Sequence, residues 1–329
     1  MGETAIRLRK TISRIGSGAI KCAAGREVIF SVWQRRAGAD SRIGLLFGEK
    51  SAGLARLFRM TFHRRIRIWL ALALPCVGTA WGAGPSYSAA GIVKVGSYAA
   101  QPFAPNSVMS IFGDGMARSA HPLVDSDLIA CTSPPAGRCL PTELNYVRVY
   151  VQDQPAPLLY VGPNQVNFLI SSMEDAGPVK VRVVTEGISG PEIVVTLVAA
   201  APALFSMADD YVIAQDSTGT LLTADAPAHA GDTVVVYVTG LGQTSPSQAP
   251  GEIPVSADRI LPATLAGLQV KLGGKALDPS LVKYAGVTPG SAGLYQINIY
   301  LPDGIGIDPE IGVTAGNQAA QTGLKLPVR

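Results

Sequence analysis

The stretch Gln165-Val166-Asn167-Phe168-Leu169-Ile170 occurs a second time about 130 residues later, as Gln296-Ile297-Asn298-Ile299-Tyr300-Leu301. In both places it follows a Tyr-x-Gly element, residues 160–162 in the first copy and 284–286 in the second. A repeat of that period indicates two copies of one structural unit in tandem. These two stretches therefore predict the architecture of the chain before any other motif is considered.

The similarity between the copies extends to both sides of that stretch. Further matching segments are 107–113 with 233–240, 146–151 with 268–272, 179–184 with 310–314, and 192–197 with 322–326. The second copy carries an insertion, Thr288-Pro289-Gly290-Ser291-Ala292-Gly293, before its Gln-Ile-Asn stretch. The two units thus share one set of segments but differ in this connection.

The repeated segments have the composition of β-strands. They are short and rich in Val, Ile, Tyr and Thr, and Gly, Pro, Asn or Asp bound them. The three valines of 146–151 fall on one face, and Tyr146, Arg148 and Tyr150 fall on the other. Six or seven such strands per roughly 100 residues predict an all-β fold of two tandem immunoglobulin-like β-sandwiches. Burial of their apolar faces, at about 25 cal/mol per Å², would be the main stabilising contribution.

The composition divides the chain into five parts. Residues 211–214 and 220–223 flank a Gly-containing turn and predict a hairpin between the two copies. We expect an N-terminal extension over 1–59, a signal peptide over 60–82, a first β-sandwich over 90–203, a hairpin and linker over 204–228, and a second β-sandwich over 229–329.

The basic residues are concentrated at one end of the chain. The formal net charge is +3, but residues 1–67 hold 15 of the 27 Lys and Arg residues and 4 of the 24 Asp and Glu residues. The remainder carries 12 basic and 20 acidic residues, a formal net charge of −8. Because a nucleic-acid-binding domain needs a basic face, this balance argues against nucleic acid as a partner.

The basic end has the organisation of a secretory signal that starts at Met60. The basic stretch 61–67 precedes the apolar stretch 68–77, and small residues for cleavage follow at 78–82. We interpret residues 1–59 as an extension upstream of the true translation start, and expect them to be disordered or loosely helical because they lack sustained periodicity. The predicted location is secreted, periplasmic or on the outer cell surface.

A connection to the membrane would need an uncleaved signal or a lipid anchor. The alternative to a cleaved signal is a cytoplasmic tail with a signal anchor, but the apolar stretch is short for a ~30 Å span and contains Pro75. Cys76 is a second candidate anchor, although Leu74 and Pro75 before it make a poor lipidation motif.

Two cysteines follow the signal, Cys131 and Cys139, at the ends of a loop with two Pro and one Gly. Because such a loop can turn back on itself, a short-range disulfide is feasible, and disulfides persist outside the cytosol. We predict this disulfide, which in the loop-entropy model contributes roughly 2–3 kcal/mol. The alternative is a metal pair or a redox dithiol, but neither has a supporting His or further Cys nearby.

The duplicated stretch contains an Asn in each copy, Asn167 and Asn298, although Asn is depleted in strands. A buried amide costs roughly 1–3 kcal/mol if it is left unpaired. We predict that both are structural strand amides, each tying a neighbouring loop through side-chain to backbone hydrogen bonds. The alternative is a ligand-facing amide.

Few residues have the pattern of a catalytic site. Beyond the signal there are two histidines, His121 and His229, and neither has the spacing of a catalytic triad. Ser291 lies in the insertion but lacks the G-x-S-x-G spacing of a nucleophile elbow, so we interpret 290–293 as a flexible loop. We therefore expect no catalytic residue and no cofactor site.

The Gly-rich and acidic segments predict turns. Residues 113–115 and 240–242 read Gly-x-Gly at the ends of equivalent strands, but no helix follows to bind a phosphate. The Asp residues of 125–127, 209–210 and 216 lack the spacing of a calcium loop, so we expect solvated turn carboxylates and no metal site. A carboxylate pair for glycoside hydrolysis depends on three-dimensional separation, and no pair stands out.

Several segments of the predicted mature chain form a specific combination: 90–98, 103–117, 157–168, 237–242 and 284–298. Together they resemble an acidobacterial, Solibacter-type secreted C-terminal domain family, over roughly residues 90–329. The family pattern often has Asn-Ala-Ala-Ser where this chain has Lys94-Val95-Gly96-Ser97, and the loop between Cys131 and Cys139 is a local elaboration. The resemblance implies a domain that commonly ends larger exported proteins, with no established activity to carry over.

Taken together, these patterns favour an exported, non-catalytic β-sandwich protein for cell-surface or extracellular protein–protein interaction or attachment. Its predicted partner is an unknown protein or cell-surface component. The first alternative is a module that binds a polysaccharide or another ligand, which the aromatic content of 6% and the location of Trp69 and Trp81 in or beside the signal weaken. The second alternative is a hydrolase with a site in the cleft between the copies.

Overall fold

The apolar faces predicted from the repeat are buried in two separate cores. The computed structural model describes residues 12–21, 27–37, 40–49, 84–131, 137–256, 261–262 and 267–329. The three valines of 147–151 are at most 2% exposed and lie in the first core with Val166 and Phe168. Their counterparts Val270 and Ile297 lie in the second core. Each repeat unit therefore buries its own apolar residues.

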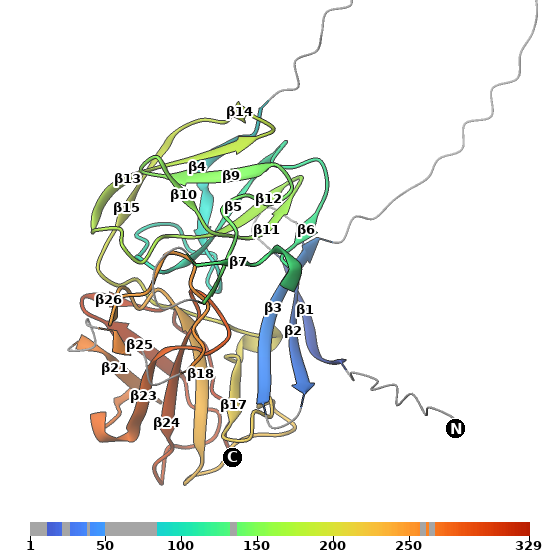
Figure 1. The fold of residues 1–329 in the computed structure, drawn as a ribbon. Helices are drawn as coiled ribbons and strands as arrows, with labels where there is room; N and C mark the ends of the chain where they lie inside the picture. The colour runs from blue at the N-terminus through green and yellow to red at the C-terminus, as the bar shows by residue number, and fades with distance from the viewer. Residues whose placement is uncertain are drawn as a thin grey trace, which may run out of the picture.

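The first sandwich consists of two antiparallel five-stranded sheets (Figure 1). One sheet has the strand order β4 (Ser86–Lys94), β5 (Val108–Asp114), β12 (Gln165–Leu169), β11 (Leu158–Gly162) and β6 (His121–Pro122). The other has the order β10 (Gln154–Ala156), β9 (Val147–Val151), β13 (Gly177–Thr185) and β14 (Ile188–Ser189), with β15 (Ile193–Leu197) also paired to β13.

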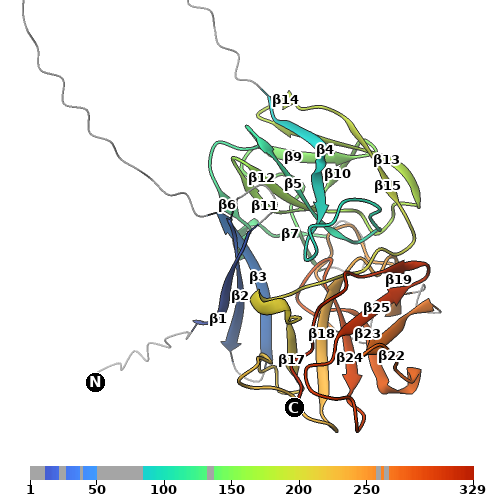
Figure 2. The ribbon, with the colours of Figure 1, turned by 180° about the vertical axis from the view of Figure 1, so that it is seen from behind.

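The second sandwich, orange and red in Figures 1 and 2, combines a five-stranded and a four-stranded sheet. The larger contains β16 (Ala203–Leu204), β18 (Thr233–Thr239), β24 (Tyr295–Tyr300) and β23 (Val282–Val287), with β17 (Ala214–Asp216) also paired to β18. The smaller contains β22 (Lys275–Ala276), β21 (Gln269–Leu272), β25 (Ile311–Ala315) and β26 (Gln318–Ala319).

The strand order confirms the prediction of two tandem immunoglobulin-like sandwiches. The series β5-β12-β11 corresponds to β18-β24-β23, and the series β10-β9-β13-β14 corresponds to β22-β21-β25-β26. Even the register irregularity of the Tyr-x-Gly strand recurs, just before Tyr160 in β11 and just before Tyr284 in β23. The copies differ at their edges. In the first, β11 also pairs with β6, whereas β23 is the last strand of its sheet as far as the structure describes it. Residues 322–326, the counterpart of β15, make isolated bridges through Lys325 in place of a ladder.

The boundary between the sandwiches lies earlier than the predicted linker over 204–228. The predicted turn is present, since Asp216 N donates to Thr220 O and Leu222 N donates to Ala214 O. However, β16 and β17 pair with β18 and so belong to the sheet of the second sandwich. The reason is that the edge of β18 needs backbone partners, a requirement set by the assembled sheet and not by the linker sequence.

Smaller elements connect these strands. Two-stranded sheets are formed by β7 (Ile129–Ala130) with β8 (Arg138–Cys139) and by β19 (Thr244–Ser245) with β20 (Leu261–Pro262). Single turns of 3₁₀ helix are η1 (Asp125–Asp127), η2 (Ala208–Asp210) and η4 (Pro279–Leu281).

An additional antiparallel sheet precedes the sandwiches, drawn in blue in Figures 1 and 2. It consists of β1 (Ile12–Lys21), β2 (Glu27–Ala37) and β3 (Asp40–Glu49), of which β1 contacts η2 and β3 contacts β6. Over these residues the structure differs from the predicted disorder or loose helix. The reason is that antiparallel pairing uses backbone groups and does not require the sustained apolar periodicity on which that prediction relied.

The predicted signal peptide over 60–82, including Cys76, lies outside the described residues. Among the residues that are described, no helix has the length and apolarity needed to cross a membrane.

Candidate functional site

The two histidines lie in different sandwiches, and each contacts a nearby carboxylate. His121 Nε2 lies 3.0 Å from Asp127 Oδ2, an oxygen that also accepts a hydrogen bond from Val124 N. His229 N donates to Asp232 Oδ2 at 2.8 Å. Both carboxylates close local turns, so the structure does not bring the histidines together with each other or with a nucleophile.

The predicted acidic turns do not converge on a metal site. Asp216 Oδ1 accepts hydrogen bonds from Thr218 N at 2.8 Å and from Thr220 N at 2.9 Å, and so closes the turn after β17. Burial acts to raise the pKa of Asp216, but the hydrogen bonds from Thr218 and Thr220 outweigh it and hold the pKa below its usual range. Within the described residues, no group of three or more His, Cys, Asp or Glu side chains is placed to hold a metal ion.

Asn167 accepts hydrogen bonds from side chains of its own sheet. It is completely buried, and its Oδ1 accepts from Gln165 Nε2 at 2.8 Å and from Ser110 Oγ at 2.7 Å. Gln165 lies two positions earlier on the same face of β12, and Ser110 lies directly opposite on β5. Asn167 therefore braces two strands, and not a loop as predicted.

Asn298 repeats half of this arrangement. Gln296 Nε2 donates to Asn298 Oδ1 at 3.0 Å, but the residue opposite Asn298 on β18 is Val235, which offers no hydroxyl. The duplicated Gln-x-Asn motif is thus a side-chain ladder along one strand face. The sequence already contained this partner, because residues i and i+2 of a strand share a face.

We expect Asn167→Ala to lower the free energy of unfolding by about 1–2 kcal/mol, because Ser110 and Gln165 would lose a buried acceptor. The loss is moderated because Asn167 Nδ2 itself has no partner in the described part of the chain. Asn298→Ala is the matched control and should cost less, since Asn298 is only half-buried. Thermal unfolding of both variants tests this; equal shifts would contradict it.

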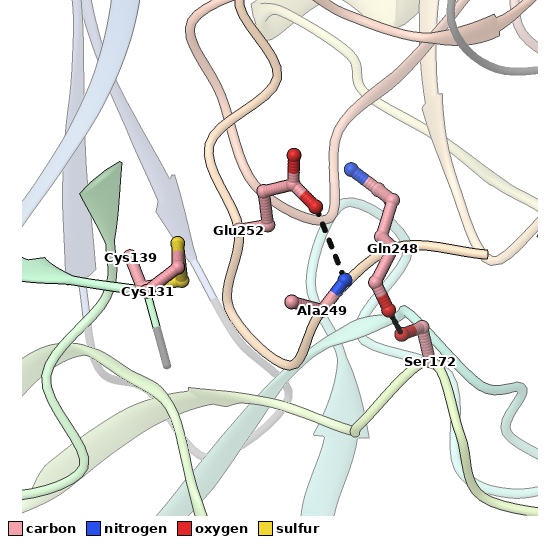
Figure 3. Close-up of a disulfide and its surroundings, with 6 residues drawn as sticks. All are labelled: Cys131, Cys139, Ser172, Gln248, Ala249 and Glu252. Carbon is pink, nitrogen blue, oxygen red and sulfur yellow. Dashed lines mark hydrogen bonds between the residues drawn. A yellow bond between two sulfur atoms is a disulfide. The ribbon is translucent and has the colours of Figure 1, made fainter. Parts of the chain in front are cut away.

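The predicted disulfide is present, and it lies at the junction of the two sandwiches (Figure 3). The Cα atoms of Cys131 and Cys139 are 5.1 Å apart, and the bond closes the small β7–β8 sheet. Residues after β7 then cross to the second sandwich: Ile253 N donates to Arg138 O, and Leu140 N donates to Gly251 O, both at 2.9 Å. The disulfide therefore fixes a segment that pairs with the neighbouring sandwich.

Beside the disulfide, buried polar side chains join the sandwiches directly. Asn106 Nδ2 donates to Gln248 Oε1 and to the Tyr295 hydroxyl, each at 2.9 Å, and these three residues are at most 4% exposed. Ser172 Oγ donates to Gln248 O at 2.7 Å (Figure 3). The Tyr295 hydroxyl donates in turn to Gly242 O. Asn106, Ser172, Gln248 and Tyr295 thus connect the two sandwiches at a contact that we call the joint. Within the described residues, Gln248 Nε2 is buried there without a hydrogen-bond partner.

The insertion of the second copy also lies in this joint. Ala292 and Leu294 are buried in an apolar cluster with Val108 and Leu169 of the first sandwich. Thr239 Oγ1 donates to Gly293 O at 3.0 Å and accepts from Val108 N at 3.2 Å. The prediction of a flexible loop over 290–293 is therefore wrong for its second half, because packing against the first sandwich orders it. The seam between the copies is a packed joint.

Stability should fall as the pH rises above 10. Burial raises the pKa of Tyr237, a residue of the same apolar cluster, from 10.0 to about 12, and burial also raises the pKa of Tyr295. Above pH 10 the unfolded chain releases these protons while the folded protein holds them, so the free energy of unfolding decreases, by about 1.4 kcal/mol per pH unit and phenol. Below pH 10 this contribution is constant.

Thermal unfolding between pH 8 and 11 measures this effect. Tyr237→Phe removes one phenol and should flatten the decline. Superimposable pH profiles for the variant and the wild type would show that Tyr237 is not the source.

The opposite end of the first sandwich carries an exposed group of loops, which we call the tip: residues 113–119, 143–148, 163–165 and 185–187. Figure 1 shows β14, which follows the last of these loops, at the end away from the second sandwich. Hydrogen bonds connect all four loops. Met116 N donates to Pro163 O, Thr185 Oγ1 donates to Met116 O, and Glu186 N donates to Tyr146 O.

Tyr146 is the most prominent side chain of the tip. It is 70% exposed, and it occupies the second position of the two-residue turn that joins Leu144 and Val147 through reciprocal backbone hydrogen bonds. Both turn residues have positive φ, +49° at Asn145 and +62° at Tyr146. A left-handed conformation costs a residue with a Cβ roughly 1–2 kcal/mol, so this turn holds Tyr146 outward at an energetic cost.

Alternation in 146–151 predicted that Tyr146 lies on the face opposite the buried valines, but no motif marked it as a site. A signal was available: Asn145 followed by Tyr146 lies where a two-residue hairpin turn favours Asn-Gly. The sequence also contained signals for the joint, because the insertion at 288–293 and the cysteine loop each occur in one copy and not in the other.

Comparison with known proteins does not assign this chain to a family. No family model matches, and no curated protein matches. Among solved structures, the chain is similar to SGBP-B from a xyloglucan utilization locus of Bacteroides uniformis (11% identity, 74% of this chain and 49% of that chain, TM-score 0.21). It is also similar to SGBP-B from a mixed-linkage glucan utilization locus of Bacteroides ovatus (11%, 72% and 59%, 0.28) and to the Ig1-2 module of the Drosophila receptor protein tyrosine phosphatase DLAR (12%, 75% and 96%, 0.17).

The chain spans 49% and 59% of the lengths of the two SGBP-B chains. At these identities and TM-scores, none of the matched proteins transfers a ligand or a partner to this chain.

Proposed function

We propose that this protein is an exported, non-catalytic module that attaches to a protein partner at the cell surface or outside the cell. The observation that carries the proposal is the joint. Buried Asn106 donates hydrogen bonds across it to buried Gln248 and Tyr295, so the two sandwiches hold one arrangement while Tyr146 at the tip of the first stays exposed. A fixed spacer with an exposed end is suited to attachment.

Two features support export. The disulfide between Cys131 and Cys139 is of a kind that persists in oxidising compartments, and the sequence predicts a signal ahead of the sandwiches. Membership in the acidobacterial secreted domain family remains part of this proposal and agrees with both features.

The exposed ring of Tyr146 favours a polysaccharide as the second candidate partner, because aromatic rings stack on sugars. The third candidate, a hydrolase with a site between the copies, requires an open cleft with convergent polar groups. At the seam, Asn106, Ser172 and Gln248 are buried and joined by hydrogen bonds, which argues against an open cleft.

The proposal is tested with the purified exported protein, fluorescently labelled and titrated onto intact cells of the organism that produces it. We expect saturable binding that is lost after the cells are treated with protease. Binding lost only after periodate oxidation of glycans would favour the polysaccharide alternative. Absence of saturable binding would contradict the attachment function.

A further inference from the structure

We propose that Tyr146 is the anchor of the binding surface, that this surface is the tip, and that its occupant is a folded protein. The inference rests on the proposed function and specifies the surface and the kind of partner. Its starting point is Tyr146, a bulky residue at a turn position whose positive φ favours Gly.

The turn at Asn145 and Tyr146 has the geometry for which Gly is favoured at the second position. The neighbouring turn of the tip follows that preference, with Glu186 at φ +51° and Gly187 at φ +81°. Tyr146 has no compensating burial, since 70% of it is exposed. A bulky side chain kept in an unfavourable conformation and pointed into solvent indicates a role outside the folding of the chain.

Most of the other residues with positive φ are of types that tolerate it. Of the ten non-glycine residues with positive φ in the described part of the chain, six are Asn or Asp, and two more are Gln152 and Glu186. The other aromatic residue with positive φ in the described part of the chain is Tyr98, whose ring centroid lies 6.3 Å from that of Phe112. Within the described residues, Tyr146 is therefore the aromatic residue that combines strain with exposure.

The polar groups around Tyr146 decide the class of partner. Arg118 makes a two-point ion pair with Glu186, Asn145 Nδ2 donates to Ser119 O at 3.2 Å, and Asn164 Nδ2 donates to Asp114 Oδ1 at 2.8 Å. A sugar is recognised by free donors and acceptors that take up its hydroxyl groups, and here many of these groups already bond to each other.

Polar residues that are already paired suit the rim of a protein–protein interface, where they exclude water and contribute little to affinity. Tyr is enriched among the few residues that dominate such interfaces, because its large ring is costly to truncate and has few rotatable bonds to order. Loops rich in Tyr, Ser, Asn, Gly and Arg form antibody paratopes for the same reasons. The tip holds a single Tyr, so its likeness to such a surface rests on the exposed ring of Tyr146 and on the paired polar residues around it.

The test uses the same titration onto intact cells with two substitutions at one position. Tyr146→Ala removes the ring, and Tyr146→Gly removes the ring and also supplies the residue that the turn favours. Both should weaken binding about 30-fold or more, as expected for an interface anchor. Tyr146→Gly should at the same time raise the melting temperature, by about 2 °C or more.

Tyr300→Ala is the matched control. Tyr300 is a 38% exposed tyrosine of the second sandwich, with Lys283 Nζ 5.6 Å from its ring centroid, and its loss should leave binding unchanged. Circular dichroism and the melting curve of Tyr146→Gly show that any loss of binding is not a loss of fold.

Three outcomes would overturn the inference in different ways. Wild-type binding by both Tyr146 variants would show that the tip is not the surface, while the attachment function would stand. Binding that depends on Tyr146 but is removed by periodate and not by protease would show that the occupant is a glycan. No binding by the wild-type protein would remove the proposed function and this inference together.

Discussion

Gly240→Ala should lower the free energy of unfolding by about 2–5 kcal/mol, with conformational strain contributing 1–2 and overpacking the rest. Gly240 directly follows β18 at the joint and has φ +80°, and a Cβ placed there would lie 2.3 Å from Ala201 O. The obstacle is backbone, so no side-chain rotation relieves it. Ala201 N also donates to Gly240 O at 2.8 Å, so a shift that relieved the clash would strain this hydrogen bond.

Gly274→Ala provides the control for Gly240→Ala. Gly274 has nearly the same φ, +79°, but its Cβ would meet nothing within 4 Å. It should show the conformational cost alone, and the difference between the two melting temperatures measures the clash at the joint. Equal destabilisation by the two substitutions would show that the contact between Gly240 and Ala201 is not tight.

Replacing both Cys131 and Cys139 by Ser should destabilise the protein by about 2–3 kcal/mol and loosen the contact between the sandwiches. Without the disulfide, the segment that follows β7 is no longer held against Gly251 and Ile253. We therefore expect hydrogen exchange of the Leu140 and Ile253 amides to accelerate more than that of the β12 amides, because local opening costs less than global unfolding.

The reduced wild-type protein is the natural comparison for the double Ser variant, and the two should behave alike. If stability fell while exchange at Leu140 and Ile253 kept its rate relative to β12, the disulfide would act only through the unfolded chain or within the first sandwich. The assignment of the disulfide to the joint would then be wrong.

The tip and the joint differ in the exposure of their key side chains. At the joint, Asn106 and Tyr295 are polar and buried, and their hydrogen bonds hold two sandwiches in one arrangement. At the tip, Tyr146 is aromatic and exposed, and the surrounding hydrogen bonds hold its loop. Rigidity at one end and an exposed anchor at the other are both expected of an attachment module, because a pre-organised surface loses less entropy on binding.

Much of the fold was predictable from local patterns. The valines of β9 alternate with more exposed residues, and alternation over a few residues is enough to predict which face of that strand is buried. It did not suffice for β12, where all five residues are buried. The repeat then predicted a second sandwich with the same set of strands. The pairing of Cys131 with Cys139 was predictable too, because only eight positions separate them and their loop can turn.

The partners of the candidate sites were not predictable in this way. Asn106 meets Gln248 across 142 positions and Tyr295 across 189, and no short pattern encodes such contacts. The loop at 290–293 was expected to be flexible because its composition is that of a loop, yet the neighbouring sandwich orders it. Likewise, β16 and β17 joined the second sheet because β18 offered an edge.

Self-similarity and alternation defined two all-β units in tandem, because strand formation and the choice of a buried face depend on residues only a few positions apart. The arrangement of the units and the closed seam between them were decided by the assembled molecule. Burial and hydrogen bonding between distant segments become defined only when both segments are in position, so these features belong to the tertiary structure.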